Sequence, residues 1–482
     1  MKKMTMKKII PIIKPVVALS ALCLQAPLLA AGFAIVENSA SGVGNSFAGA
    51  AAVGEDASTV WFNPAAMSRL GDRPAISSSA HLIMPSAKFT DRGSSVNPNL
   101  TGGNSSLASA LLTGQPSDTA DTNAFVPNIY YVRSINDRMH FGVGVNAPFG
   151  LEVTYEDNWI GRYLATRSEM ETININPSIS WKANDRLSLG AGLNAQYINV
   201  KLGSAIDSGA LCRSSATALN DNALLVDCLT NPQLGLANAA SDSKALISGD
   251  DVSYGYNLGL LLDATPRTRI GASYRSKISH KLKGTVDFTV NSALSGATLS
   301  NGMPLNLALG ASTLKDREVT ANADLPDSAS FSIAHQLNNR FELLADATWT
   351  GWSSFKELRV VDTAGSDIAL TNEDWEDVWR YSIGGKYHYS DQLTLRAGAA
   401  LDKSPIPNAN LRTPRIPGND RHWLSFGADY KIRDNIKVNV GYAHLFVDDT
   451  AINHTSADNG YTIKGLYESD VDILSAQLNW KY

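Results

Sequence analysis

Apolar and polar residues alternate along most of this chain. Around Ile436, Val438 and Val440, for example, apolar side chains alternate with Lys437 and Asn439. A period of two predicts a β-strand with one face in apolar surroundings. About fourteen segments show it, and many exceed the roughly five or six residues usual in soluble sheets. They lie at residues 73–91, 124–135, 138–154, 161–183, 186–203, 250–264, 268–290, 317–337, 340–360, 374–389, 392–403, 420–432, 436–447 and 464–482.

The connections between these segments alternate between short and long. Short ones such as Asn136-Asp137, Asn184-Asp185 and Asn338-Asn339 are rich in residues that tolerate left-handed backbone angles. Short turns on one rim and long loops on the other are typical of outer-membrane barrels, whose short turns face the periplasm. The pattern therefore predicts an all-β fold, a transmembrane antiparallel barrel of about fourteen strands over residues 73–482. The connection near 155–160 is an exception, because it is short on the long-loop side.

Composition narrows the class of protein further. Charged residues make up 18% of the chain and the formal net charge is −5. With no basic block, these values give no support to nucleic-acid binding. After the first thirty residues, no apolar run approaches the roughly 20 residues that a membrane helix needs. The mature chain is thus expected to have no helical anchor.

The first thirty residues have the pattern of a secretory signal peptide. Lysines such as Lys2 and Lys3 precede a short apolar stretch from Pro15 to Leu24, and small residues follow at Ala30. We therefore expect residues 1–30 to be removed and the protein to be exported to the outer membrane of a Gram-negative cell. Cys23 raises the alternative of a lipoprotein, although Leu22 stands where a small residue is usual.

Residues 31–72 do not alternate and precede the first strand. They are rich in Gly, Ala and Ser, and they are too few for a stable independent domain. A disordered tail is one interpretation. The aromatic residues of the segment favour a compact plug instead, because the lumen of a fourteen-stranded barrel is wider than its own side chains fill. These aromatic residues are Phe33, Phe47, Trp61 and Phe62.

The same segment resembles the hatch of the FadL-type transporters of long-chain fatty acids and their aromatic-hydrocarbon relatives. The run from Ala31 to Ala65 carries the resemblance, and its triplet Asn63-Pro64-Ala65 matches the N-P-A motif of that family. Aquaporins carry such a triplet twice on membrane half-helices, which this chain lacks. Stretches at 126–151 and 402–425 are also similar to the family. The resemblance implies a hatch at 31–72, with Phe33, Phe47, Trp61 and Phe62 as ligand-gating residues.

A break in the third strand is the second feature that the resemblance interprets. Alternation up to Val145 is interrupted by Asn146-Ala147-Pro148-Phe149-Gly150, where Pro148 has no N–H for the ladder and Gly150 permits a kink. Pro148 lying above the membrane is the simpler explanation. In FadL-type proteins the equivalent strand is kinked inward, which implies that residues 146–150 mark a lateral exit into the membrane.

Apolar residues in the long loops are candidates for the outer end of a ligand route. The resemblance implies a low-affinity outer groove, although these side chains would equally serve to pack the loops together. The groove candidates are Leu234, Leu236, Leu305 and Leu307.

A carboxylate head group would need a cation in the lumen. The candidates on predicted strands are Arg162, Arg167, Arg275 and Lys277.

Few residues suggest any other chemistry. The eight His residues are scattered, and the chain lacks H-E-x-x-H and G-x-S-x-G motifs. Cys212 and Cys228 lie sixteen positions apart in a predicted outer loop, which favours a disulfide over two free thiols or a metal site. We therefore expect no enzyme activity, no metal and no cofactor.

The predicted function is passive uptake of hydrophobic small molecules by a monomeric channel. Long-chain fatty acids are the preferred substrate, moved by rearrangement of the hatch and lateral exit. The alternatives are an aromatic-hydrocarbon channel of the same family, a general porin and an outer-membrane hydrolase. A carboxylate would require a cation in the lumen, whereas an aromatic hydrocarbon would not.

Overall fold

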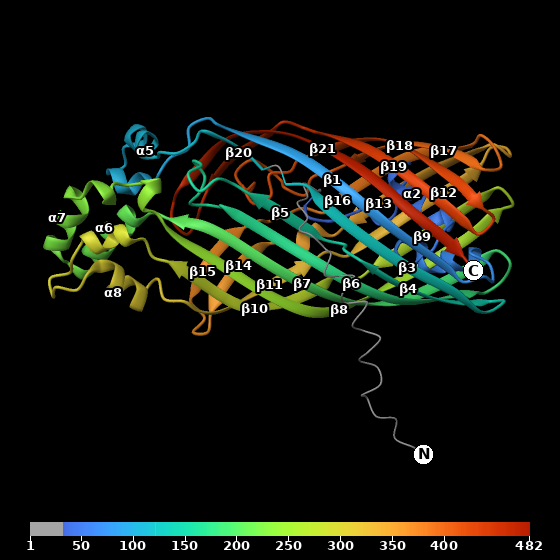
Figure 1. Ribbon diagram of the computed structural model, residues 1–482, viewed down its shortest axis with the longest axis horizontal. Helices are drawn as coiled ribbons and strands as arrows, with labels where there is room; N and C mark the ends of the chain where they lie inside the picture. Colours follow the sequence, from blue (N-terminus) through green and yellow to red (C-terminus); the bar gives the residue numbers. More distant parts are fainter. Residues whose placement is uncertain (1–31, 121) are drawn as a thin grey trace, which may run out of the picture.

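One closed antiparallel sheet forms most of the molecule (Figure 1). The computed structural model describes residues 32–120 and 122–482. The first strand, β1 (Ala75–Asp91), pairs along its length with the last, β21 (Thr462–Lys481), so that the sheet closes into a barrel. The predicted signal peptide at 1–30 and the alternative at Cys23 lie outside the described residues.

In the described residues, fourteen antiparallel strands form the wall of the barrel, as the alternation predicted. Each follows its neighbour in sequence, which is the simplest up-and-down order. Between β1 and β21 the principal strands are β3 (Ala124–Asn136), β4 (Met139–Asn146), β6 (Arg167–Lys182), β7 (Leu187–Ile206), β8 (Ser243–Thr265), β9 (Thr268–Arg275), β12 (Ser328–Gln336), β13 (Phe341–Thr350), β16 (Val378–His388), β17 (Leu393–Asp402), β18 (Arg421–Arg433) and β19 (Ile436–Val447).

Shorter strands continue several of these toward the long-loop end of the barrel. The hairpin of β14 and β15 lies partly in a stretch expected to be loop, and the strand expected from residue 161 begins at Arg167, because residues 155–166 form turns. The shorter strands are β2 (Ser117–Thr119), β5 (Gly150–Thr154), β10 (Ile278–Thr289), β11 (Arg317–Leu325), β14 (Glu357–Asp362), β15 (Asp367–Asn372) and β20 (Thr450–Thr455).

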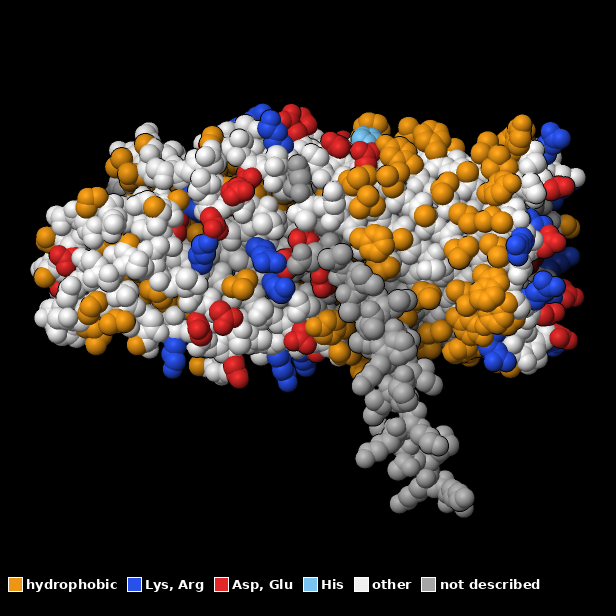
Figure 2. Space-filling model, viewed as in Figure 1, with side chains coloured by type: hydrophobic (Ala, Val, Ile, Leu, Met, Phe, Trp, Pro, Cys, Tyr) orange, Lys and Arg blue, Asp and Glu red, His pale blue; other side chains and the backbone are white. Residues whose placement is uncertain are grey.

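The two faces of the wall reverse the arrangement of a soluble protein. On β21, Leu474, Leu478 and Trp480 are exposed on the outside, whereas Gln477 and Asn479 are buried inside. Exposed apolar side chains gather in a band over the short-turn half of the barrel (Figure 2). Such a band is the lipid-facing surface of a transmembrane barrel. No helix in the described part of the chain is long and apolar enough to cross a membrane.

Helices cover the long-loop end, far from the C-terminus (Figure 1). The sequence pattern predicted loops here. Leucines of these helices pack around the disulfide that joins Cys212 to Cys228, whose Cα atoms lie 5.7 Å apart. The elements of this end are α5 (Ser105–Leu111), α6 (Ser208–Leu219), α7 (Asn222–Thr230) and α8 (Leu305–Ala311), with the 3-10 turns η3 (Pro98–Thr101), η4 (Pro232–Leu234), η5 (Ala239–Ser241) and η6 (Ser292–Gly296). Another 3-10 turn, η7 (Trp352–Ser354), directly follows β13.

Residues 32–72 fold into short helical turns inside the barrel. Their sides contact inward faces of strands from all around the wall, including β6, β8, β9 and β19. Most of the segment is buried, including Phe33, Val43 and Ala65. This segment, called the hatch below, contains α2 (Ala40–Val43), α3 (Ala50–Val53), α4 (Thr59–Phe62) and η2 (Pro64–Arg69).

Candidate functional site

Asn63 of the Asn63-Pro64-Ala65 triplet connects the hatch to the barrel wall. Its side-chain oxygen accepts from the N–H of Ala65 at 3.0 Å and so caps η2, in which Pro64 occupies the first turn. Its Nδ2 donates to the carbonyl of Ala51 at 2.6 Å and to that of Leu260 in β8 at 2.9 Å. The motif thereby fixes both the fold of the hatch and its position.

Glycines on the inward face of the wall let the hatch backbone approach closely. A Cβ atom at Gly190 would lie 2.3 Å from the nitrogen of Ala65, and one at Gly259 would lie 2.1 Å from Oδ1 of Asn63. At Gly271 it would lie 2.0 Å from the carbonyl oxygen of Ala51. Any larger residue at these positions would displace the hatch.

The wall is interrupted at the predicted kink. Strand β4 ends at Asn146 opposite Asn174, and β5 begins at Gly150 opposite Glu171, so three residues stand where β6 has two. Strand β3 pairs with β4 only from Ile129 onward, and in the described residues its segment 124–128 has no strand partner on that side. The ladder is therefore broken beside β5.

The first residues of the hatch pair with this kink. The N–H of Ile35 donates to the carbonyl of Pro148 at 2.8 Å, and the N–H of Gly150 donates to the carbonyl of Phe33 at 2.9 Å. Backbone groups that the break removes from the barrel ladder are thus satisfied by the hatch. A movement of this segment would expose them.

An aromatic cluster holds Phe33. Its ring centroid lies 4.7 Å from that of Trp352, 5.3 Å from Phe355 and 5.6 Å from Trp375, and 6.1 Å from Phe149 of the kink. Sequence reasoning named Phe33 and Phe149 but missed the other three. The interruption of alternation after β13, at 351–355, is the signal that could have marked Trp352 and Phe355.

Two buried carboxyl groups lie in this region: Glu37 belongs to the hatch, and Glu373 accepts a hydrogen bond from Trp375 of the aromatic cluster. Burial raises the pKa of Glu37 to about 7, although Arg421 and Arg380 act in the opposite direction. Burial also raises the pKa of Glu373 to about 8, against the hydrogen bond that Nε1 of Trp375 donates to it at 3.0 Å. Both groups therefore favour the protonated form near neutral pH more than an ordinary glutamate does.

A cavity of about 150 Å³ lies between the hatch and the wall. It brings together several of the residues singled out in the sequence: three hatch aromatic residues and two kink residues contribute to one surface. Two arginines and one aspartate stand among its otherwise mostly apolar and hydroxyl lining. The residues that matter here are Phe47, Trp61, Phe62, Pro148, Phe149, Arg275, Asp346 and Arg380.

The arginines of the cavity come from two strands, β9 and β16, which are separated in the wall by β12 and β13. Arg275 at the end of β9 stacks on the ring of Trp61 at 3.4 Å and donates to Asn194 at 2.5 Å. Arg380 in β16 lies 4.9 Å from the ring centroid of Trp423 and donates to the carbonyl of Ser46 at 3.1 Å. Of the four cations proposed from the sequence, Arg275 is the one that lines this cavity, and Arg380 was missed.

The other three proposed cations lie elsewhere. Arg162 is fully buried among the outer loops, where it pairs with Asp242 at 2.6 Å. Lys277 pairs with Asp324 at 3.0 Å on a half-exposed surface. Arg167 pairs with Glu169 near the long-loop end. Each has a local carboxylate partner away from the cavity.

The leucines proposed for an outer groove divide into two groups. Leu234, Leu236 and Leu305 are buried, because they pack the loop helices together. Leu307 is 61% exposed. Three of the four therefore do not offer open surface. Below these loops lies a second cavity of about 480 Å³, whose apolar lining includes Leu202, Leu211, Ile247, Phe288 and Leu358.

These features define a class of protein: an outer-membrane β-barrel channel for hydrophobic compounds, closed by its own N-terminal hatch. Residues 21–482 match the family described as "Outer membrane protein transport protein (OMPP1/FadL/TodX)". The chain belongs to this family. The membership confirms the predicted family and fold, and the expectation of a non-enzymatic channel.

Relatives and solved structures agree with this assignment. The chain is 29% identical to the "Long-chain fatty acid transport protein" of Escherichia coli over 448 residues, which cover 91% of this chain and 93% of that protein. It is also 29% identical to "Outer membrane protein P1" of Haemophilus influenzae over 436 residues, 86% of each. The crystal structure of a Pseudomonas aeruginosa FadL homologue superposes with a TM-score of 0.78 at 27% identity, covering 93% of this chain and 99% of that one. The Ralstonia pickettii toluene transporter TbuX, at 18% identity, has a TM-score of 0.60 over 92% of this chain and 98% of that one, which shows the shared fold.

Proposed function

We propose that this channel takes up long-chain fatty acids. The observation that carries the proposal is the cavity beside the hatch, where an apolar lining meets Arg275 and Arg380. A carboxylate head group would be stabilised by charge-assisted hydrogen bonds from a guanidinium. An aromatic hydrocarbon carries no charge that could pair with these two cations. The likeness over most of the chain to a transporter of long-chain fatty acids supports the same substrate class.

The substrate is tested by uptake of labelled oleate and toluene into cells that produce the protein in a strain lacking its own transporter. We expect oleate uptake, and a loss of about tenfold or more in Arg380→Met, the loss expected when a charged hydrogen-bonding partner is removed. Lys277→Met, which removes a cation outside the cavity, is the matched control. Toluene uptake with no oleate uptake would favour the aromatic-hydrocarbon alternative.

We propose a route from the outer loops to the membrane. The long-loop end would face the outside, and the cavity below the loops would receive the ligand first. The ligand would then enter the cavity beside the hatch as the segment 33–38 shifts, and leave through the break between β3 and β5. Lateral exit keeps an acyl tail out of water, which saves about 0.8 kcal/mol for each CH₂.

The exit is tested by replacing residues 146–150 with a regular alternating strand. We expect a folded barrel that has lost uptake. Uptake that persists in a folded variant would refute the lateral exit. Planar-bilayer conductance separates the proposal from a general porin, because a plugged monomer should show no large open conductance.

A further inference from the structure

Buried and half-buried charged side chains line the lumen near the short-turn end of six strands, at the level of the hatch. Wall residues supply four cations and two carboxylates, and the hatch adds Glu55. We name this set the charge belt. Its members are Arg269 of β9, Glu342 of β13, Lys386 of β16, Arg396 of β17, Asp429 of β18, Lys437 of β19 and Glu55.

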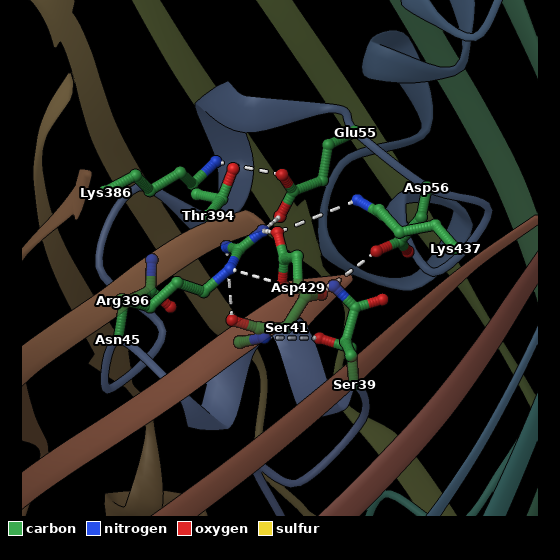
Figure 3. Close-up of polar contacts among 12 residues, drawn as sticks. Ser39, Ser41, Asn45, Glu55, Asp56, Lys386, Thr394, Arg396, Asp429 and Lys437 are labelled. Carbon is green, nitrogen blue, oxygen red and sulfur yellow. Dashed lines mark hydrogen bonds and ion pairs between the residues drawn. The ribbon is translucent and has the colours of Figure 1, made fainter. Parts of the chain in front are cut away.

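The carboxylate of Glu55 points toward Lys386 and Arg396 of the belt (Figure 3). One of its carboxylate oxygens lies 3.0 Å from Nζ of Lys386 and the other 2.7 Å from a guanidinium nitrogen of Arg396. Each of these cations also has a wall partner, Glu342 at 3.3 Å for Lys386 and Asp429 at 2.5 Å for Arg396. Glu55 therefore joins two wall ion pairs that are otherwise separate.

The two cations are more deeply buried than the carboxylate that they bind. The side chains of Lys386 and Arg396 are 3% and 1% exposed, whereas that of Glu55 is 25% exposed, so the loss of Glu55 would leave two buried cations without one of their partners. Burial alone would raise the pKa of Glu55, but Arg396 and Lys386 lower it well below its ordinary value. The hatch thus presents an ionised carboxylate to the belt.

Further bonds hold the hatch body against the same part of the wall. Arg396 donates to the carbonyl of Ser41 at 3.3 Å, and Gln477 of β21 accepts from the N–H of Ala40 at 2.9 Å. On the neighbouring strand β1, the hydroxyl of Ser77 accepts from the N–H of Ala57 at 2.9 Å. The hatch body is therefore fixed at this end, while residues 33–35 contact the kink.

We propose that Glu55 is the positioning residue that keeps the hatch body docked, and that the charge belt around it closes the short-turn mouth of the channel and so directs apolar ligands sideways. The belt carries four positive and three negative charges. An apolar ligand that moved past it would separate buried ion pairs without replacing their partners. The apolar residues at the kink impose no such cost. This inference deepens the proposed uptake function and rests on it for the direction of exit.

The docked hatch is tested by ion conductance in planar bilayers, which needs no substrate. Glu55→Gln preserves the shape of the side chain but leaves four positive charges facing two negative ones. We expect the undocked population, seen as open-channel events, to rise by at least about tenfold, because a buried ion pair that loses one partner leaves an uncompensated charge. Glu55→Asp retains the charge and should return conductance toward that of the natural protein.

The matched control is Asp263→Asn, which removes another ion pair between hatch and wall. Asp263 lies 3.0 Å from Arg69, but the two side chains are 36% and 32% exposed, so this pair contributes little. It should leave conductance unchanged. Folding of every variant is checked by the shift in gel mobility between unheated and heated samples.

The two proposals fail in different ways. Folded Glu55→Gln that conducts no more than the natural protein, or Asp263→Asn that leaks equally, overturns the role of Glu55 and leaves uptake through the kink intact. A leak in Glu55→Gln together with oleate uptake that survives removal of the kink would retain the docking role but overturn the lateral route. Both proposals are supported if Glu55→Gln leaks and oleate uptake is retained in it but is lost when the kink is removed.

Discussion

Asn63 shows how one side chain connects local folding to function. It caps η2 and also donates to the wall, so Asn63→Ala removes a cap and a contact between hatch and barrel together. We expect the docked hatch to lose about 1–3 kcal/mol. Faster hydrogen exchange in residues 40–69 would measure this. Asn231→Ala, which removes a cap of the same kind from an outer loop, should leave the hatch protected; equal exchange in both variants would contradict the role of Asn63.

Glu373 makes the aromatic cluster around Phe33 sensitive to pH. Because burial raises its pKa to about 8, the protonated form contributes stability that is full below the ordinary pKa of 4.5 and is lost as pH rises through about 8. Each unit of this shift corresponds to about 1.4 kcal/mol. Because the intrinsic rate of amide exchange itself rises with pH, the quantity to compare is the protection factor at each pH. We expect the protection factors of residues 33–38 to be lower at pH 9 than at pH 6, and Glu37, with its pKa raised to about 7, to add to the change.

Glu373→Gln is the check on this prediction. It removes the titrating group and keeps an acceptor for Nε1 of Trp375, so the pH dependence should shrink to the part that Glu37 contributes. An unchanged pH profile in Glu373→Gln would show that the cluster does not respond to this group.

The roles of residues within one local segment were predictable from the sequence, but the residues that they contact across the lumen were not. Phe33, Trp61 and Phe62 stand out as aromatic residues in a small-residue segment without alternation, and the family resemblance assigned them to a hatch. The contacts of Arg380 and Glu55 depend on the register of distant strands and on the fold of the hatch. Alternation says which face a strand residue occupies, but it does not say which side chains meet across the lumen.

At the scale of elements, strands and short turns were predictable because both depend on local chemistry. The period of two and the Asn and Asp residues at hairpins need no knowledge of the rest of the fold. The long loops were different. Helices α6, α7 and α8 are short, and they are stabilised by packing on one another and by the disulfide. The predicted break at Pro148 is present as the gap between β4 and β5.

The inward glycines carry a prediction at this scale. Gly190 lies on the face of β7 that points into the lumen, and the hatch backbone lies directly against it. Gly190→Ala should displace the Asn63-Pro64-Ala65 segment, because the new Cβ would meet backbone atoms that have no flexible end. We expect a more protease-sensitive hatch in an intact barrel. The control Gly385→Ala, whose Cβ would lie 3.4 Å from its nearest neighbour, should be tolerated, and equal sensitivity would refute the explanation.

At the scale of the whole molecule, the hatch consists of two parts with different attachments. Its body is held by the charge belt, by Asn63 and by close contact with inward glycines. Its first residues are held by the kink and by aromatic rings. We expect such a channel to open by moving the first residues while the body stays docked, because those residues have fewer ionic contacts with the wall.

Engineered cross-links test which of the two parts of the hatch moves during transport. Ala34 and Phe149 face each other across an antiparallel bridge, so cysteines at both positions can form a disulfide that holds the first residues on the kink. Oleate uptake should be lost when this bond is oxidised and should return on reduction, whereas the uptake of each single cysteine variant should not respond to the oxidant. Cysteines in place of Ala51 and Ser332, which join the hatch body to β12 through a hydrogen bond of 3.0 Å, should leave uptake unchanged. If this second cross-link also abolishes uptake, the whole hatch moves during transport; if neither does, the ligand passes without displacing it.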